Sequence, residues 1–113
     1  MSRRPVILRA RADFDLADAI DRYLTEAGAG PALALIDAVE RAFGHIARHP
    51  DSGSPRYAHE LDLPGLRTWP VRRHPYLIFY IAREDHIDVL RILHAARDVP
   101  ASLTANGEND EQP

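Results

Sequence analysis

The chain contains no cysteine, no lysine and no long apolar run. Without cysteine it can form neither disulfides nor thiolate metal sites, a usage that fits a reducing compartment. No stretch approaches the roughly 18 apolar residues that a membrane-spanning helix needs. Near the start, only Val6, Ile7 and Leu8 separate Pro5 from Arg9, which is shorter than the apolar core of a signal peptide. We therefore expect a cytoplasmic protein that does not engage a membrane.

The rest of the composition is that of one small globular domain. The chain has 113 residues, of which 45% are hydrophobic, and this supports a core without disulfides or metals. All 14 positively charged residues are arginine, yet the formal net charge is -3, unlike that of a DNA-binding polycation. The arginines reflect either a GC-rich genome or a need for paired recognition of carboxylates and phosphates. Composition does not separate these two explanations.

Apolar spacing predicts two helices in the first half of the chain. The first covers residues 12–27, and its apolar face contains Leu16, Ile20, Tyr23, Leu24 and Ala27. Asp13, Asp15 and Asp18 fall in its first turns, where negative charge complements the helix dipole. Gly28 to Gly30 end this helix, and Pro31 opens a second one that closes at Pro50. Its apolar face contains Leu35, Ile36, Val39, Phe43 and Ile46. The short link predicts an antiparallel hairpin.

The remaining periodicity predicts strands. Residues 6–9 form a short strand before the helices, 51–65 a loop, and 66–73 a strand broken by Pro70. Residues 76–83 and 87–93 form two further strands joined by a tight turn. We expect an α+β domain over residues 1–103, in which an N-terminal strand and an antiparallel helical hairpin precede a three-stranded antiparallel meander. The polar tail, 104–113, is predicted to be disordered.

The last two strands carry apolar residues on both faces, so we expect both faces of the sheet to be covered. The helical hairpin covers one face. The other face then needs a second cover, which suggests a partner molecule.

An arginine cluster is the first candidate site. Arg67, Arg72 and Arg73 lie beside Trp69 and Tyr76. Arginines interleaved with aromatic residues can hold phosphates and stack bases. They can equally form a solvated strand face that docks an acidic segment of a partner, and we favour this second interpretation.

A polar group after the last strand is the second candidate. His94 is followed by Arg97 and Asp98. A histidine can act as a general acid or base near neutral pH. Such a group more often ties a strand end to neighbouring backbone, and we favour that structural role here.

No metal or cofactor site is predicted. His45 and His49 stand four residues apart and can share a helix face, but no third ligand accompanies them, and no glutamate follows His45 as a zinc protease requires. The sequence also has no glycine-rich phosphate loop, nucleophile elbow or supported Ser/His/Asp set.

Two segments resemble the RelE/ParE toxin superfamily. The first is HIARHPDSG at the end of the second helix, and the second is LPGLRTWPVRRHPYLIFYIAREDHIDVLRILHAARD, which is similar to the ParE branch. The resemblance covers residues 6–100. It implies the toxin of a type II toxin–antitoxin pair of the plasmid-stabilising kind, which arrests growth by poisoning DNA gyrase. It further implies no active site of its own, no cofactor, no direct sequence-specific DNA binding, and a ParD-like antitoxin that wraps over the toxin. The residues expected to bind antitoxin or target are Arg67, Trp69, Arg72, Arg73, Tyr76, His94 and Arg97.

The RelE branch implies an alternative, the ribosome-dependent cleavage of mRNA. This chemistry needs a base, an acid and cations for the phosphorane. Here Glu60 and His94 are the candidate base and acid, with Arg67, Arg72 or Arg73 on the phosphate. The absence of lysine, and of tyrosine after Tyr80, argues against it. A non-toxic binding module on the same scaffold is the third possibility.

Overall fold

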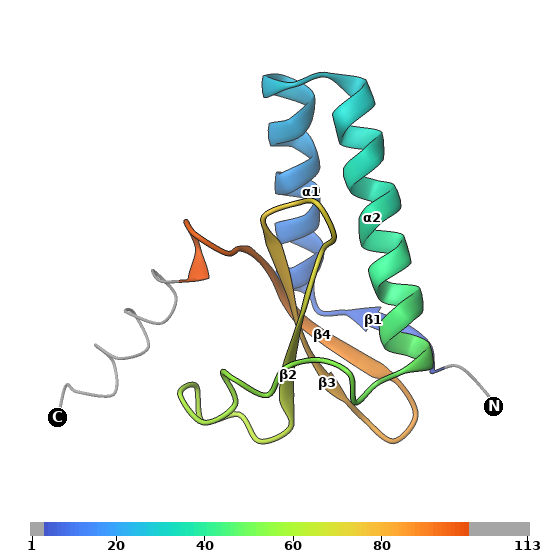
Figure 1. Ribbon diagram of the computed structural model, residues 1–113, viewed down its shortest axis with the longest axis vertical. Coiled ribbons are helices and arrows are strands. Elements are labelled where there is room, and N and C mark those ends of the chain that lie inside the picture. Colours follow the sequence, from blue (N-terminus) through green and yellow to red (C-terminus); the bar gives the residue numbers. More distant parts are fainter. Residues whose placement is uncertain (1–3, 100–113) are drawn as a thin grey trace, which may run out of the picture.

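The computed structural model describes residues 4–99, which form a helical hairpin and one sheet (Figure 1). The elements in chain order are β1 Val6–Leu8, α1 Ala10–Glu26, α2 Ala29–Arg48, β2 Leu66–Pro70, β3 Tyr76–Ala82 and β4 Ile87–His94. The predicted α+β class and element order are confirmed. The predicted tail and the domain boundary at residue 103 lie outside the described residues. Within residues 4–99, neither helix is long and apolar enough to cross a membrane.

The sheet has the order β1-β4-β3-β2. The last three strands form the predicted antiparallel meander, and β1 adds to it in parallel beside β4, with Val6 opposite Ile87 and Leu8 opposite Val89. The sheet is therefore four-stranded and mixed. The predicted meander accounts for β2, β3 and β4 but not for the position of β1. The first strand of the fold lies beside the last.

A β-bulge interrupts the pairing of β3 with β4. Phe79 pairs with Arg91 and Tyr80 with Val89, so Leu90 is an extra residue on β4. A bulge of this kind redirects the side chains that follow it. Beyond it, the Arg91 side chain reaches Asp15 on α1.

The hairpin packs on one face of the sheet through small side chains. Ala12 and Ala19 of α1 are buried, and so are Leu35, Val39 and Ile46 of α2. Small residues let a helix approach the strands closely. Leu24, which was expected on the buried face, is 48% exposed, because the distal part of the hairpin extends beyond the sheet (Figure 1).

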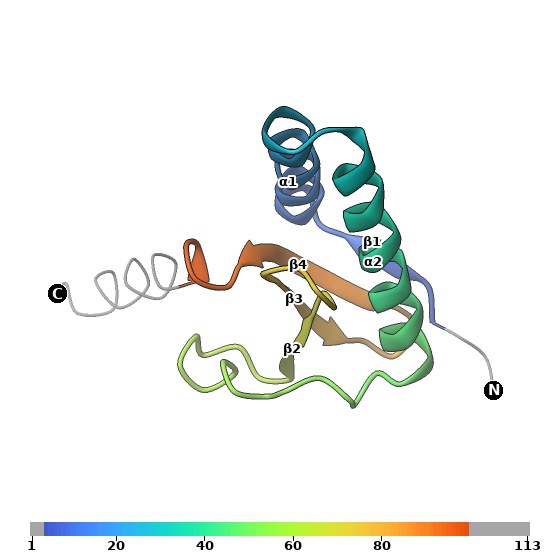
Figure 2. The same ribbon diagram turned by 45° about the horizontal axis from the view of Figure 1, so that its top comes forward.

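The opposite face of the sheet is partly covered by the chain itself. Figure 2 shows the helices on one side and the segment between α2 and β2 on the other. A second hydrophobic cluster forms there from Tyr57, Leu66, Phe79, Ile81, Leu93 and Val99. The chain itself therefore covers part of the face for which a partner was suggested. The loop predicted at 51–65 supplies much of the cover.

A buried tyrosine anchors the start of this covering segment. The Tyr80 hydroxyl donates to the carbonyl oxygen of Pro50 at 2.8 Å and accepts from the Gly53 N–H at 3.0 Å. A Cβ at Gly53 would clash with that hydroxyl and approach the Thr68 carbonyl oxygen at 2.9 Å. Burial raises the pKa of Tyr80, so the hydroxyl remains a neutral donor and acceptor. Position 53 therefore requires glycine.

The strand predicted at 66–73 ends earlier, at Pro70. Beyond Pro70 the backbone turns back: the Val71 N–H donates to the Tyr76 carbonyl and the His74 N–H to the Val71 carbonyl. Residues 71–75 thus form the β2–β3 turn.

Candidate functional site

A groove of about 790 Å³ lies between one side of α2 and the β2–β3 turn. We call it the arginine groove. It is lined by Ala34, Asp37, Ala38, Arg41, Ala42, His45, Arg48, Trp69, Pro70, Arg72, Arg73 and His74. The groove combines two of the predicted site arginines with a side of α2 that the sequence did not single out.

Helical spacing places Arg41, His45 and Arg48 on the groove side of α2. Val39 and Ile46 belong to the core instead. Arg41 Nε donates to Asp37 Oδ2 at 3.0 Å, one turn earlier. This exposed pair cancels one positive charge of the groove wall. Arg48, in contrast, makes no ion pair with any acidic residue among residues 4–99.

The β2–β3 turn supplies the opposite wall. Val71 is buried and fixes the turn, while Arg72 and Arg73 are both exposed. Neither arginine forms an ion pair with an acid of the described chain. Arg73 has a φ of 69°, a left-handed conformation that is uncommon for a long side chain. Together with Arg48 these residues are the free arginines of the groove.

A stacked aromatic pair ties α2 to β2 at the base of the groove. The rings of His45 and Trp69 are stacked, with centroids 4.2 Å apart and an interplanar angle of 16°. Burial, together with the nearby His49 and Arg48, lowers the pKa of His45, so this ring is neutral at pH 7. One face of Trp69 is therefore occupied by His45. Within residues 4–99, no group of three or more potential ligands could hold a metal ion.

A second aromatic group, formed by Tyr23, His74 and Tyr76, packs against the turn on the side of α1. The Tyr23 hydroxyl and His74 Nδ1 share a hydrogen bond of 3.0 Å, and the Tyr23 ring lies 6.3 Å from that of Tyr76. Burial raises the pKa of Tyr23. Tyr76 was expected to contact a partner, but it is buried in the core and supports the turn from beneath.

Arg67 does not join the other two arginines of the predicted cluster. It pairs with Tyr80 across the sheet, and its Nη1 donates to the Gly53 carbonyl oxygen at 2.7 Å. It does not line the groove. Its role is to hold the segment that follows α2.

His94, Arg97 and Asp98 form a compact cap on the end of β4. His94 Nδ1 accepts from the N–H groups of Ala96 at 3.2 Å and Arg97 at 3.1 Å, and Asp98 Oδ2 accepts from the His94 N–H at 3.0 Å. Arg97 and Asp98 also form an ion pair at 3.5 Å. These contacts are the ones expected if the three residues tie the end of β4 to neighbouring backbone. Binding of a partner by His94 or Arg97 stays a prediction.

The residues proposed for RNA cleavage are not brought together. His94 lies opposite Tyr76, whereas Arg67 lies opposite Tyr80, four residues further along β3, or about 13 Å. Glu60 lies in the segment between α2 and β2 that packs over the other face of the sheet. Glu60, Arg67 and His94 therefore do not share one pocket.

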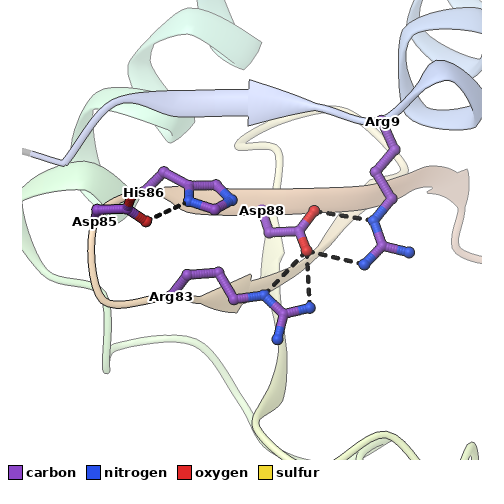
Figure 3. A network of polar contacts seen from close by, with 5 residues as sticks. All are labelled: Arg9, Arg83, Asp85, His86 and Asp88. Atoms are coloured by element: carbon purple, nitrogen blue, oxygen red, sulfur yellow. Dashed lines mark hydrogen bonds and ion pairs between the residues drawn. The ribbon is translucent and has the colours of Figure 1, made fainter.

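Three other arginines are paired with carboxylates that are mostly buried. Arg9 donates to both carboxylate oxygens of Asp88, at 3.0 and 2.9 Å, and Arg83 donates twice to Asp88 Oδ2, at 3.1 and 2.9 Å (Figure 3). The hydrogen bonds from Arg9 are the first cause that lowers the pKa of Asp88, and those from Arg83 add to it. The Arg91 guanidinium donates hydrogen bonds to both carboxylate oxygens of Asp15, at 2.8 and 3.1 Å. We call Arg9, Arg83 and Arg91 the paired arginines.

Comparison with known proteins gives one family and one fold. A family model described as "ParE toxin of type II toxin-antitoxin system, parDE" matches residues 6–99. The fold is similar to a chain of a structure described as "Chromosomal ParDE TA system from P. aeruginosa", with a TM-score of 0.67 and 22% sequence identity. This match covers 80% of the present chain and 95% of that chain. A search of curated proteins found no match.

Proposed function

Because the chain belongs to the ParE toxin family of type II toxin–antitoxin systems, we propose that a cognate, ParD-like antitoxin binds and silences it. The observation that carries this proposal is the family match over residues 6–99, nearly all of the described chain. The structural neighbour is itself described as a ParDE system. Phe14 and Leu33 on the hairpin are 69% and 65% exposed. They offer apolar surface that a partner can cover.

The antitoxin is expected to cross the hairpin and the arginine groove as an extended or helical segment. Its carboxylates would pair with the free arginines Arg48, Arg72 and Arg73. Guanidinium groups bind carboxylates through two parallel hydrogen bonds. Arg67 was expected to take part, but its bond to Gly53 already commits it.

The proposed cellular target is DNA gyrase in the cytoplasm, with DNA breaks and growth arrest as the result. This target follows from the family and is supported by the separation of Glu60, Arg67 and His94, which favours binding over RNA cleavage. The toxin would then act by binding gyrase and stabilising one conformation of it.

The decisive experiment expresses the toxin alone and measures DNA breaks and mRNA cleavage in the same culture. We expect breaks that require gyrase, no ribosome-dependent cleavage, and rescue by the antitoxin encoded beside the toxin. Cleaved mRNA without DNA breaks would replace gyrase with the ribosome as the target.

A charge-reversal experiment tests the antitoxin surface. Arg72→Glu combined with Arg73→Glu should weaken the antitoxin complex by at least about tenfold, because each change replaces an attraction with a repulsion. Arg56→Glu, at an exposed position of the segment between α2 and β2, is the matched control. Equal affinity of all three proteins would remove the groove from the antitoxin interface.

A further inference from the structure

The arginine groove carries uncompensated positive charge in a chain whose net charge is -3. Arg41 is neutralised by Asp37, and His45 is neutral because its pKa is lowered. The free arginines remain, and they come from two walls: Arg48 from α2, and the other two from the β2–β3 turn. A ligand that satisfies both walls must present several negative charges along its length.

A phosphodiester backbone has this property. Double-stranded DNA carries one negative charge for about every 1.7 Å of its axis, and the guanidinium fork binds phosphate oxygens in pairs. The aromatic residues of the groove favour backbone contact over base contact. One face of Trp69 is stacked on His45, and Tyr76 is buried, so the two rings offer bases far less open aromatic surface than the free arginines offer to phosphates. Contact limited to phosphates carries no sequence information.

The conformation of Arg73 agrees with a binding role. Its left-handed backbone, with φ at 69°, is unfavourable for arginine. Glycine or asparagine would suit this position better for folding alone. An arginine kept in a strained turn beside two other free arginines indicates that its charge is used.

We propose that the arginine groove holds the phosphodiester backbone of the DNA bound by gyrase, and that antitoxin carboxylates compete with these phosphates for the free arginines. This inference rests on the proposed function, because it takes gyrase as the target. It extends that function by making DNA a direct contact of the toxin. Neutralisation then consists of replacing one anion with another at the same guanidinium groups.

A photo-crosslinking experiment distinguishes contact with DNA from contact with protein. The chain has no cysteine, so a single introduced cysteine can carry a benzophenone group. Ala34 lines the groove on α2, and both Ala34 and the control residue Ala17 on α1 are exposed. Ala34→Cys and Ala17→Cys toxins are labelled, bound to gyrase with duplex DNA, and irradiated.

We expect the label at position 34 to attach to a DNA strand, the label at position 17 not to do so, and added antitoxin to abolish the DNA product. Attachment at position 34 to protein alone, in a complex that still breaks DNA, would overturn the inference and leave the proposed function intact. Toxin that fails to bind gyrase in a pull-down overturns both.

Arginine variants provide the second measurement. With Arg48→Gln, Arg72→Gln and Arg73→Gln combined, the toxin concentration needed to trap broken DNA should rise at least about tenfold, because charge-assisted hydrogen bonds are lost. Arg11→Gln should leave it unchanged. Equal trapping by the triple variant and the parent would contradict the inference.

Discussion

The paired and the free arginines use the same side chain for opposite purposes. Arg9 and Arg91 meet carboxylates of the chain itself, and they join elements that are distant in sequence. The free arginines line a groove and form no ion pair with a carboxylate of the described chain. The paired arginines are distinguished by a mostly buried acid beside each of them. Exposure alone does not separate the two sets, since Arg9 and Arg83 are 53% and 43% exposed.

The largest effect is expected where a paired arginine depends on a nearly buried acid. Asp15 is 10% exposed, and it accepts from Arg91 and from the Ile92 N–H at 3.0 Å. Asp15→Asn should lower the free energy of unfolding by about 2–4 kcal/mol, because the guanidinium loses its charged partner. Urea unfolding measures this loss. Asp13→Asn, on an exposed residue of the same helix, is the control. Equal stability of the two variants would show that the Asp15–Arg91 pair stabilises the fold no more than an exposed charge does.

A somewhat smaller effect, with a defined pH dependence, is expected at Asp88. Its pKa is lowered in the folded protein, while an aspartate of the unfolded chain titrates near pH 3.9. The stabilisation is therefore complete above about pH 4 and is lost as the pH falls through the lower folded pKa. Asp88→Asn should cost about 1–2 kcal/mol at pH 7, since both arginines are half-exposed.

Unfolding free energies measured across acid pH test this prediction. The parent and Asp88→Asn should converge as the pH falls below 4, because the parent then loses the same charge. A difference that stays constant down to the acid limit would show that the ionised carboxylate is not what stabilises the parent.

His94 should tolerate replacement by a side chain that keeps its acceptor. Glutamine can accept from the Ala96 and Arg97 N–H groups but cannot exchange a proton near pH 7. We expect His94→Gln to lose about 1 kcal/mol or less and to retain toxicity in a growth assay. Loss of toxicity in a folded His94→Gln protein, together with mRNA cleavage by the parent, would instead assign His94 to catalysis, where its loss costs roughly 100- to 10,000-fold.

The smallest effect on stability is expected at the free arginines. Arg48→Gln and Arg72→Gln should change the unfolding free energy by less than about 0.5 kcal/mol, as is usual for exposed positions. Arg73→Gly should raise it by about 0.5 kcal/mol, because glycine adopts a positive φ without strain. Thermal melts measure all three. If one of these variants were destabilised, that arginine would contribute to the stability of the fold, as the paired arginines do.

The sequence predicted the elements well and their long-range contacts poorly. Periodicity located both helices and all four strands, because the 3.6- and 2-residue patterns are local properties. Leu24 was misplaced because an apolar stripe does not show how far a hairpin extends beyond its sheet. The cover supplied by Tyr57 and Leu63 was missed because an irregular segment has no period to detect.

The candidate site was only half predictable. Arg72 and Arg73 were visible because they are adjacent in the sequence, but Arg48 and His45, which complete the groove, come from another element. Arg67 was assigned to the site because it is close in sequence, yet strand pairing turns it toward Gly53. The Asp15–Arg91 pair was hidden because its members lie 76 residues apart. The aspartate itself had been explained by the helix dipole alone.

The parallel pairing of β1 with β4 also has a consequence for the order of synthesis. Val6 to Leu8 are translated before both helices, but their partners, Ile87 to Val89, are translated only after them. The helical hairpin can form early from local contacts, whereas the sheet stays open at β1 until β4 emerges. The chain therefore has a period during translation in which the helical hairpin can already be folded but the sheet is incomplete.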